Sequence, residues 1–328
     1  MTDVCVSAAP STLLADWTDE KRSLFRREVV TFQHRLLETG LFTDEALARL
    51  IDSHPRDSLD ICTMSRKPMS NETWAGGEAK GLSGADLIEA THRGRLWLNV
   101  RRAMNENPLY RPVLDQLLAE FSKATGARIL RAHGSVLISA PSCQVFYHCD
   151  QAETMLWHLR GQKTMYLYPP VEPYLADVDY EAVVMRQNLG DIPYHAGLDA
   201  GADPVRLTPG SGVTWPLHAP HRVVNAETFN VSVSVEFTTP TSMMTNGTFY
   251  TQGVMRRSLG LSPKTRATPK VLQPVYWAAS KLLKKVAPIR HDALAAHPRM
   301  FDVDLSAPDC IAWRPGYGPK DVALDAAA

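Results

Sequence analysis

The chain has 328 residues, 45% of them hydrophobic, and its 35 Lys and Arg residues balance its 35 Asp and Glu residues. This length and apolar content suffice for one large domain or two small ones with a packed core. A formal charge of zero supplies no overall basic field, so neither nucleic acid nor a membrane surface is expected as a partner. No run approaches the roughly eighteen apolar residues of a membrane-spanning helix.

The cysteines predict a reducing environment. Their number is odd, their spacing is wide, and no C-x-x-C occurs, so neither a disulfide framework nor a Cys-rich zinc site is expected. The first residues carry Asp3 and no positively charged segment, and Pro10 interrupts their apolar stretch, so no signal peptide is expected. We therefore predict a cytoplasmic protein. The cysteines are Cys5, Cys62, Cys143, Cys149 and Cys310.

The front of the chain is predicted to be mainly helical. Thr43 fits an N-cap, and Ser83 with Asp86 resembles a capping box. We treat residues 1–127 as a mainly helical region that packs on the rest of the fold. The spacing of apolar residues predicts helices over 18–39, 44–53, 85–92, 95–106 and 109–124.

From about residue 128 the pattern changes to short runs rich in Val, Ile, Tyr and Thr, separated by Pro and Gly. Many short strands at this spacing predict a mainly β core, an antiparallel barrel or sandwich, over 128–240. In the run 230–237, polar and apolar residues alternate, so one face of that strand can line a cavity. The expected strands are 129–137, 144–148, 154–159, 164–168, 212–216 and 230–237.

After residue 240 the strand pattern fades, and we expect a helical C-terminal region over 241–328. Apolar residues at helical spacing predict a helix over 269–286, with lysines along one edge. The simplest interpretation of this helix is packing against the core with solvated lysines. A homodimer formed through it is the alternative.

The histidines and one aspartate suggest a metal site. His148 and Asp150 are two residues apart, so on one strand they share a face and can reach one ion. A second histidine-rich segment, residues 215–221, follows about seventy residues later and offers His221 or His218 as a third ligand. Two imidazoles and one carboxylate on one face of a metal leave open positions, as in non-haem Fe(II) oxygenases. We favour His221.

Two other histidines are assigned elsewhere. His158 lies within an expected strand and is interpreted as a barrel-wall or core residue, and His195 lies in a Pro- and Gly-rich loop. An anionic cosubstrate buried in the barrel would need a cation, because an unpaired buried charge is costly. Lys163, on the strand after the Gly161 turn, is the preferred candidate, and Arg160 is the alternative.

The segment 148–170 carries a family pattern. It combines H-x-D, the turn Arg160-Gly161-Gln162-Lys163, and a strand that ends in an aromatic residue and two prolines, Tyr168-Pro169-Pro170. This arrangement resembles the Jumonji-C and cupin-like 2-oxoglutarate oxygenases. It is nearest to the branch typified by the asparaginyl hydroxylase that inhibits hypoxia-inducible factor. The resemblance covers roughly 128–240.

The resemblance implies a double-stranded β-helix, that is a jelly-roll or cupin barrel, with flanking helices. It implies a dioxygenase that uses Fe(II) and 2-oxoglutarate, converts 2-oxoglutarate to succinate and hydroxylates an unactivated C–H bond. His148, Asp150 and His221 would be the catalytic metal ligands. Lys163 would bind the distal carboxylate of 2-oxoglutarate.

The chain also departs from the family pattern. Val145 stands where a hydroxyl often helps to bind 2-oxoglutarate, and Thr154 and Ser234 are the candidates that would compensate. Glu236 stands near the end of the polar strand, where the related branch tends to carry an amide. A carboxylate there would repel a cosubstrate carboxylate. Either Glu236 points elsewhere, or it recognises a cationic group on the substrate.

Three functions remain open. The first is the 2-oxoglutarate-dependent hydroxylase, with 2-oxoglutarate and dioxygen as partners and an amino-acid side chain of a peptide or protein, or a small molecule, as substrate. The second is another cupin-class metalloenzyme that needs no 2-oxoglutarate, and the third is a non-catalytic cupin-like regulator. Residues proposed to line the cavity mouth are Trp74, Trp97, Asn99, Arg101 and Arg131.

Overall fold

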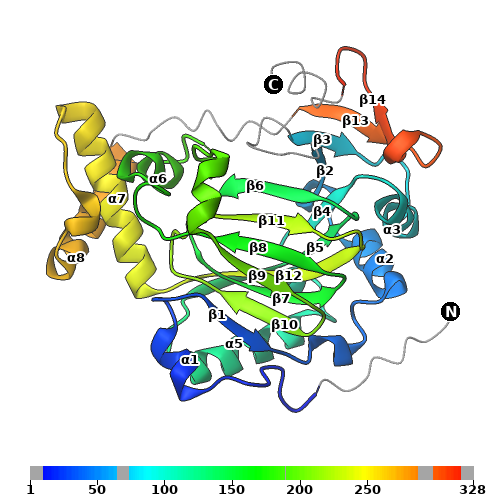
Figure 1. Cartoon of the computed structure of the whole chain (residues 1–328), viewed down its shortest axis with the longest axis horizontal. Helices are drawn as coiled ribbons and strands as arrows, with labels where there is room; N and C mark the ends of the chain where they lie inside the picture. The colour runs from blue at the N-terminus through cyan, green and yellow to red at the C-terminus, as the bar shows by residue number, and fades with distance from the viewer. Residues whose placement is uncertain (1–9, 65–73, 189, 287–297, 319–328) are drawn as a thin grey trace.

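The fold is built on two sheets, which are antiparallel apart from one parallel pair near the end of the larger sheet (Figure 1). The computed structural model describes residues 10–64, 74–188, 190–286 and 298–318, so Cys5 lies outside the described residues. A four-stranded sheet has the order β6-β11-β8-β9, and a ten-stranded sheet contains the run β10-β7-β12-β5. From β5 to β12 successive strands alternate between the two sheets, apart from β8 and β9, which are neighbours in the four-stranded sheet. This is the connectivity of a jelly roll. The predicted double-stranded β-helix is thereby confirmed.

Six of the eight jelly-roll strands follow the predicted β runs closely, and the other two, β9 and β11, were not predicted. Their positions are set by short runs of β-branched and aromatic residues between turns. The bounds are β5 Arg131–Ser139, β6 Gln144–His148, β7 Glu153–Arg160, β8 Lys163–Leu167, β9 Asp203–Leu207, β10 Ser211–Thr214, β11 His221–Asn225 and β12 Asn230–Thr238.

The alternating strand β12 lies between β5 and β7 and has two different faces. Val231, Val233 and Val235 are fully buried in the main core with helical residues such as Phe121. The opposite face carries the polar residues, and Ser234 and Glu236 line a cavity between the two sheets. The alternation read from the sequence therefore correctly gives one core face and one cavity face.

The front region contains more strand than the sequence predicts. The predicted helix over 18–39 is wrong beyond its first turns, because β1 follows α1 and pairs with β10. The predicted helix over 95–106 is also wrong in its first half, where β4 pairs with β5. The front elements are α1 Asp19–Leu24, β1 Val30–Gln33, α2 Asp44–Ser53, β2 Leu59–Met64, β3 Trp74–Glu78, α3 Gly84–Arg93, β4 Trp97–Val100, α4 Ala103–Glu106 and α5 Arg111–Thr125.

Two predicted helix starts are present in the structure. The Thr43 side chain accepts a hydrogen bond from the backbone N–H of Ala46 at the start of α2. Ser83 and Asp86 form the capping box of α3. These contacts satisfy backbone donors that a helix start leaves free.

The rest of the chain forms helices at one end of the sandwich and a final pair of strands (Figure 1). These elements are α6 Asp177–Val184, α7 Pro240–Leu259, α8 Gln273–Val286, β13 Arg299–Val303 and β14 Ile311–Trp313. β13 pairs in parallel with β3, and the Phe301 ring occupies the space where a side chain on Gly77 would lie. Within the described parts of the chain, no helix combines the length and apolar character needed to cross a bilayer.

Candidate metal centre and adjoining cavity

The two histidines of the candidate site face each other across paired strands. His221, the first residue of β11, lies opposite His148, the last residue of β6, and their ring centroids are 4.1 Å apart. The next pair along the ladder is Val223 with Val145, so β6 contains one residue more than β11 between the two pairs. An extra residue of this kind is a β-bulge, and it allows both Val145 and His148 to face the interior.

Backbone hydrogen bonds fix the tautomer of both imidazoles. His148 Nδ1 lies 2.8 Å from the carbonyl oxygen of Phe146, and His221 Nδ1 lies 3.1 Å from that of Ala219. Because a carbonyl oxygen can only accept, each Nδ1 carries a proton, so in the neutral form of either ring the free lone pair is on Nε2. This is the arrangement found in metal-binding histidines, where a hydrogen bond on one nitrogen orients the other.

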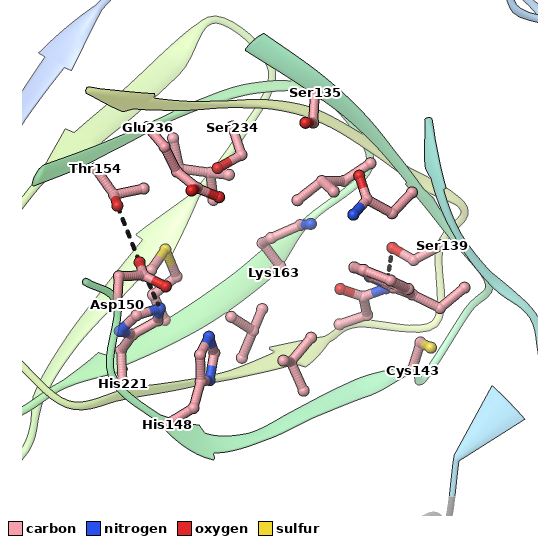
Figure 2. Close-up of a pocket in the computed structure, with 18 of the residues that line it drawn as sticks. Ser135, Ser139, Cys143, His148, Asp150, Thr154, Lys163, His221, Ser234 and Glu236 are labelled. Carbon is pink, nitrogen blue, oxygen red and sulfur yellow. Dashed lines mark hydrogen bonds and ion pairs between the residues drawn. The ribbon is translucent and has the colours of Figure 1, made fainter. Parts of the chain in front are cut away.

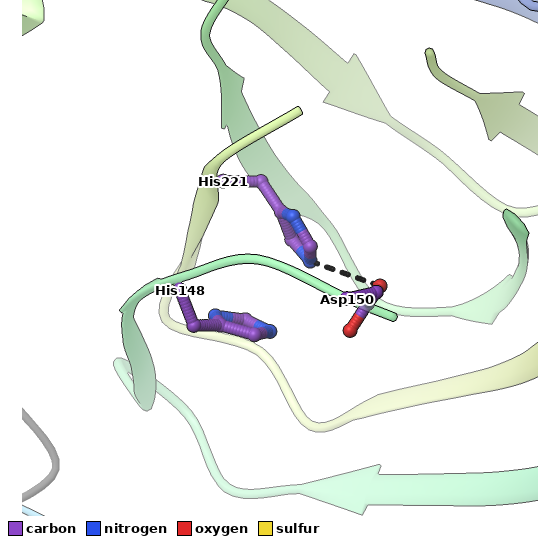
Figure 3. A group of neighbouring side chains, drawn as sticks. All are labelled: His148, Asp150 and His221. Carbon is purple, nitrogen blue, oxygen red and sulfur yellow. Dashed lines mark ion pairs between the residues drawn. The ribbon is translucent and has the colours of Figure 1, made fainter. Parts of the chain in front are cut away.

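Asp150 completes the cluster from the turn after β6 (Figure 3). Its Oδ2 lies 3.7 Å from His221 Nε2, and one ligand atom from each of Asp150, His148 and His221 lies within 4.8 Å of the others. The aspartate therefore does not reach the site as the i+2 neighbour on one strand, as the sequence argument assumed. The Thr154 hydroxyl donates a 3.0 Å hydrogen bond to Asp150 Oδ2 and so orients the carboxylate.

The imidazole of His221 is held neutral. Its pKa is lowered to about 4, first by burial and then by the nearby His148, against the opposing effect of the Asp150 carboxylate. Trp215 packs against the same ring, with centroids 4.8 Å apart. A neutral imidazole near pH 7 is the form that binds a metal ion.

A cavity of about 190 Å³ extends from this cluster between the two sheets (Figure 2). Its walls combine apolar side chains with a few polar groups, as is typical of small-molecule sites. The lining residues are Trp97, Asn99, Ser135, Leu137, Ser139, Cys143, Val145, His148, Asp150, Thr154, Leu156, Lys163, Met165, Trp215, His221, Val223, Asn225, Ser234 and Glu236.

Lys163 provides a buried positive charge in this cavity. It begins β8, opposite Asn225 of β11, and is 7% exposed. Burial lowers the pKa of its ammonium to about 8, and the nearby Cys143 thiol opposes that shift. Among the described residues, no hydrogen bond or ion pair to this ammonium is present, and it is the only Lys or Arg that lines the cavity. A buried cation without a partner favours an anionic ligand.

Glu236 carries the second unusual charge. Its side chain projects into the cavity near Ser234 and Thr154 (Figure 2). Although the residue is exposed, the pKa of its carboxyl is raised to about 7, first by the loss of hydration in the cavity and then by repulsion from Asp150. The first alternative stated for Glu236, that it points elsewhere, is therefore wrong.

The other candidate residues have separate roles. His218 is buried, donates from Nε2 to Asn246 at 2.8 Å and stacks on Tyr180, so it does not replace His221. His158 is a core histidine, bonded to Ser232 and to the Gly161 carbonyl, as the sequence predicted.

Arg160 does not assist Lys163, because its guanidinium pairs with Asp44 at the start of α2. His195 is exposed in a loop outside the cavity.

Of the five residues proposed for the cavity mouth, two line the cavity. Trp97 and Asn99 do so from β4. Trp74 instead packs edge-on against Trp97, with centroids 5.0 Å apart, and Arg101 pairs with Asp60. Arg131 does not contribute to the cavity lining.

Sequence reasoning missed Asn225, Cys143 and Trp215 as lining residues. Of these, Asn225 could have been found from the alternation of His221, Val223 and Asn225 along β11.

Comparison with known proteins gives distant structural likeness. No family model and no curated protein matches the chain. The X-ray structure of YcfD from Escherichia coli is similar at 15% identity and a TM-score of 0.49, over 84% of this chain and 69% of that chain. A complex of YcfD, described as a ribosomal oxygenase, with cobalt and 2-oxoglutarate has 16% identity and a TM-score of 0.47, over 84% and 68% of the two chains.

A cupin superfamily protein from Desulfitobacterium hafniense is 12% identical, with a TM-score of 0.22, over 34% of this chain and 71% of that chain. At such identities and scores the likeness carries no argument about the site. The assignment of the fold rests on the strand order described above. The proteins found are of the kind that the sequence resemblance names, and the narrower likeness to the asparaginyl hydroxylase branch stays a prediction.

Proposed function

We propose that this protein is an Fe(II)- and 2-oxoglutarate-dependent oxygenase that hydroxylates an unactivated C–H bond. The observation that carries the proposal is the convergence of two imidazoles and one carboxylate at one end of a cavity that also contains a buried lysine with no partner among the described residues. Two nitrogen ligands and one oxygen ligand suit Fe(II) and leave coordination positions for a cosubstrate and dioxygen.

The residues fit a metal ion of this kind. Bonds from a first-row metal to imidazole or carboxylate are about 2.0–2.2 Å long, so two ligand atoms of one ion are at most about 4.4 Å apart. The 3.7 Å between His221 Nε2 and Asp150 Oδ2 is within that limit. We infer that His148, Asp150 and His221 hold the metal, and that Thr154 keeps the carboxylate in position.

The cosubstrate assignment rests on Lys163. A dicarboxylate that reaches from the metal cluster into the cavity would place its distal carboxylate near this ammonium, where a charge-assisted hydrogen bond is strong because water is largely excluded. Ser234 adds a hydroxyl to the cavity from β12 in the other sheet. Apolar side chains, including Leu156, Met165 and Val223, keep water from the reacting groups.

With Fe(II) bound, the reaction would be R–H + O₂ + 2-oxoglutarate → R–OH + succinate + CO₂, and the metal and cosubstrate supply the oxidising power. The chain's own contribution is to bind, orient and enclose the reactants. We propose an amino-acid side chain of a peptide or protein as the substrate. An open groove of about 450 Å³ beside Asp150, lined by residues of α6 and α7, supports a substrate larger than a metabolite.

The test is the formation of succinate from 2-oxoglutarate by the purified protein with Fe(II) and oxygen. We expect turnover that depends on both additions. Asp150→Ala should abolish it and should also weaken binding of Mn(II), measured by calorimetry under anaerobic conditions. The exposed carboxylate Glu227 lies in the turn between β11 and β12, so Glu227→Gln is the matched control and should behave like wild type. Undiminished turnover by Asp150→Ala would contradict the proposal.

A further inference from the structure

Two short turns carry candidate metal ligands to the same place. Residues 149–152, between β6 and β7, include Asp150, and residues 215–220, between β10 and β11, lead directly into His221. Among the described residues, no hydrogen bond joins one turn to the other directly. Metal affinity depends on groups that hold the ligands in position, so a side chain that ties the two turns to each other matters for the site.

Asn246 of α7 forms such a link. Its Nδ2 donates a 2.6 Å hydrogen bond to the carbonyl oxygen of Gln151, the residue after Asp150. Its Oδ1 lies 2.8 Å from Nε2 of His218, in the other turn. Because a carbonyl oxygen only accepts, the bond to Gln151 fixes the orientation of the amide and makes His218 Nε2 the donor. One side chain therefore holds both turns from the same helix.

The amide of Asn246 is itself held in place by α6. The Tyr180 hydroxyl donates a 2.8 Å hydrogen bond to Asn246 Oδ1, and the Tyr180 ring stacks on His218 with centroids 3.7 Å apart. Tyr180 is fully buried, in a core that also contains Phe249 of α7. Loss of the amide would therefore release the turns, whereas the two helices would stay packed against each other.

The turn that leads to His221 depends on these contacts. His218 has φ +71°, in the left-handed region that residues with a Cβ seldom adopt. The ring stack and the hydrogen bond on His218 offset the cost of that conformation. One residue further on, the carbonyl oxygen of Ala219 lies 3.1 Å from His221 Nδ1 and orients the imidazole. A change in the backbone at His218 would therefore pass directly to the ring of a candidate metal ligand.

We propose that Asn246 is a positioning residue of the metal centre, which holds the carboxylate of Asp150 and the imidazole of His221 at the separation that one ion requires. It acts through Gln151 and His218. Because its Oδ1 accepts two hydrogen bonds and its Nδ2 donates another, Asn246 is not itself a ligand. This inference rests on the metal centre of the proposed function and adds to it a residue from outside the ligand set.

The experiment measures the affinity for Mn(II) by anaerobic calorimetry with full-length protein. Asn246→Ala should raise the Kd about tenfold, the lower end of the range for groups that orient metal ligands. Gln252→Ala is the matched control, because Gln252 is a buried amide of the same helix, donates to Thr268 and lines neither the cavity nor the groove. It should lower the free energy of unfolding in urea and leave the Kd for Mn(II) within about twofold of wild type.

A double-mutant cycle separates positioning from general loosening of the fold. His218→Phe keeps a ring to stack on Tyr180 and removes the Nε2 donor, so it breaks one arm of the link. The double variant Asn246→Ala/His218→Phe should bind Mn(II) about as weakly as Asn246→Ala alone, because both changes break the same link. In Co(II)-loaded protein, the visible absorption bands report the coordination geometry. They should shift in Asn246→Ala and stay as in wild type in Gln252→Ala.

A Kd for Mn(II) in Asn246→Ala within about twofold of wild type would overturn the inference, and so would an equal loss in Gln252→Ala. Absence of Mn(II) binding by the wild type would overturn it as well. If Asn246→Ala does not fold, His218→Phe decides the question, since its Kd should rise at least about threefold and a smaller change overturns the inference. Failure of the oxygenase proposal alone is distinguishable, as wild-type protein that binds Mn(II) but forms no succinate with Fe(II), 2-oxoglutarate and oxygen.

Discussion

Replacement of Lys163 by methionine tests the cosubstrate assignment most directly. Methionine keeps an unbranched side chain of similar length and removes the charge, so the cavity stays filled. Lys163 is the only cation that lines the cavity among the described residues, and no neighbouring arginine can take its place. Arg160 cannot do so because its guanidinium pairs with Asp44 and it does not line the cavity.

The size of the effect follows from burial. Lys163 is 7% exposed, so a carboxylate bound to it is also removed from water. Removing one partner of a buried, hydrogen-bonded charge pair costs about 2–5 kcal/mol. At about 1.4 kcal/mol per tenfold change, the Kd for 2-oxoglutarate should rise by roughly 30-fold to several thousand-fold in Lys163→Met.

The lowered pKa of Lys163 also predicts that the affinity for 2-oxoglutarate depends on pH. Burial lowers its pKa to about 8, and only the protonated form attracts a carboxylate. The affinity for 2-oxoglutarate should therefore be constant well below pH 8. Above pH 8 it should fall about tenfold per unit, because binding must then restore a proton to the ammonium. Lys163→Arg keeps its charge throughout this range, so its affinity should not change with pH.

Anaerobic calorimetry with Mn(II)-loaded protein measures these dissociation constants between pH 6 and pH 10. Circular dichroism and a urea titration show whether each variant remains folded. A Kd that changes less than about threefold in Lys163→Met would refute the reasoning, since the wild-type ammonium would then make no contact with the ligand. A wild-type affinity independent of pH up to 10 would refute it as well.

Three further changes test other contacts. Thr154→Val removes the hydroxyl that orients the Asp150 carboxylate, so the affinity for Mn(II), measured by calorimetry, should fall about 10- to 100-fold. Thr154→Ser keeps the hydroxyl, so its affinity for Mn(II) should stay near that of wild type. Glu181 is fully buried and forms ion pairs with two arginines of α7. Glu181→Gln should therefore lower the free energy of unfolding, measured in urea, by about 3 kcal/mol. A loss below about 1 kcal/mol would contradict a stabilising role for these ion pairs. Gly161→Ala should cost about 2 kcal/mol or more in the same assay, because φ is +79° and a Cβ would lie 2.2 Å from the Phe229 carbonyl oxygen. Gly81, with φ +71° and open space around it, is the matched control, and equal losses in Gly81→Ala and Gly161→Ala would exclude the steric contribution.

The residues of the candidate site could be predicted because the patterns that point to them lie within short stretches of the sequence. His148 and Asp150 are neighbours in sequence, and the turn before Lys163 brings it onto the next strand. The alternating strand that soon follows His221 favours this histidine over His218. Each of these arguments uses fewer than about twenty consecutive residues, within the range where periodicity and turn residues are informative.

The geometry of the cluster could not be predicted in the same way. Strict alternation along β6 from Val145 would turn Tyr147 inward and His148 outward. The bulge reverses this, since Tyr147 packs in a separate core with Tyr168 and His148 faces the cavity. A bulge depends on the pairing partner, β11, which lies about seventy residues away in sequence.

The strands of the front region were missed for a related reason. Trp97–Val100 is only four residues long and continues directly into the short helix α4, so its apolar spacing also fits a helix. Its extended conformation is stabilised by β2 and β5 on either side. Pairing between segments that are distant in the chain overrides the weak local preference for a helix. A single sequence does not reveal such pairing.

The parallel pair β3 and β13 has a consequence for biosynthesis. These two strands lie more than two hundred residues apart in the chain, at Trp74–Glu78 and Arg299–Val303. While the polypeptide emerges from the ribosome, β3 must wait with one edge unpaired until almost the whole chain has been translated. An uncovered edge is a template for intermolecular association. Translation products that stop before β13 should therefore aggregate, even though every residue of the proposed metal centre has been made.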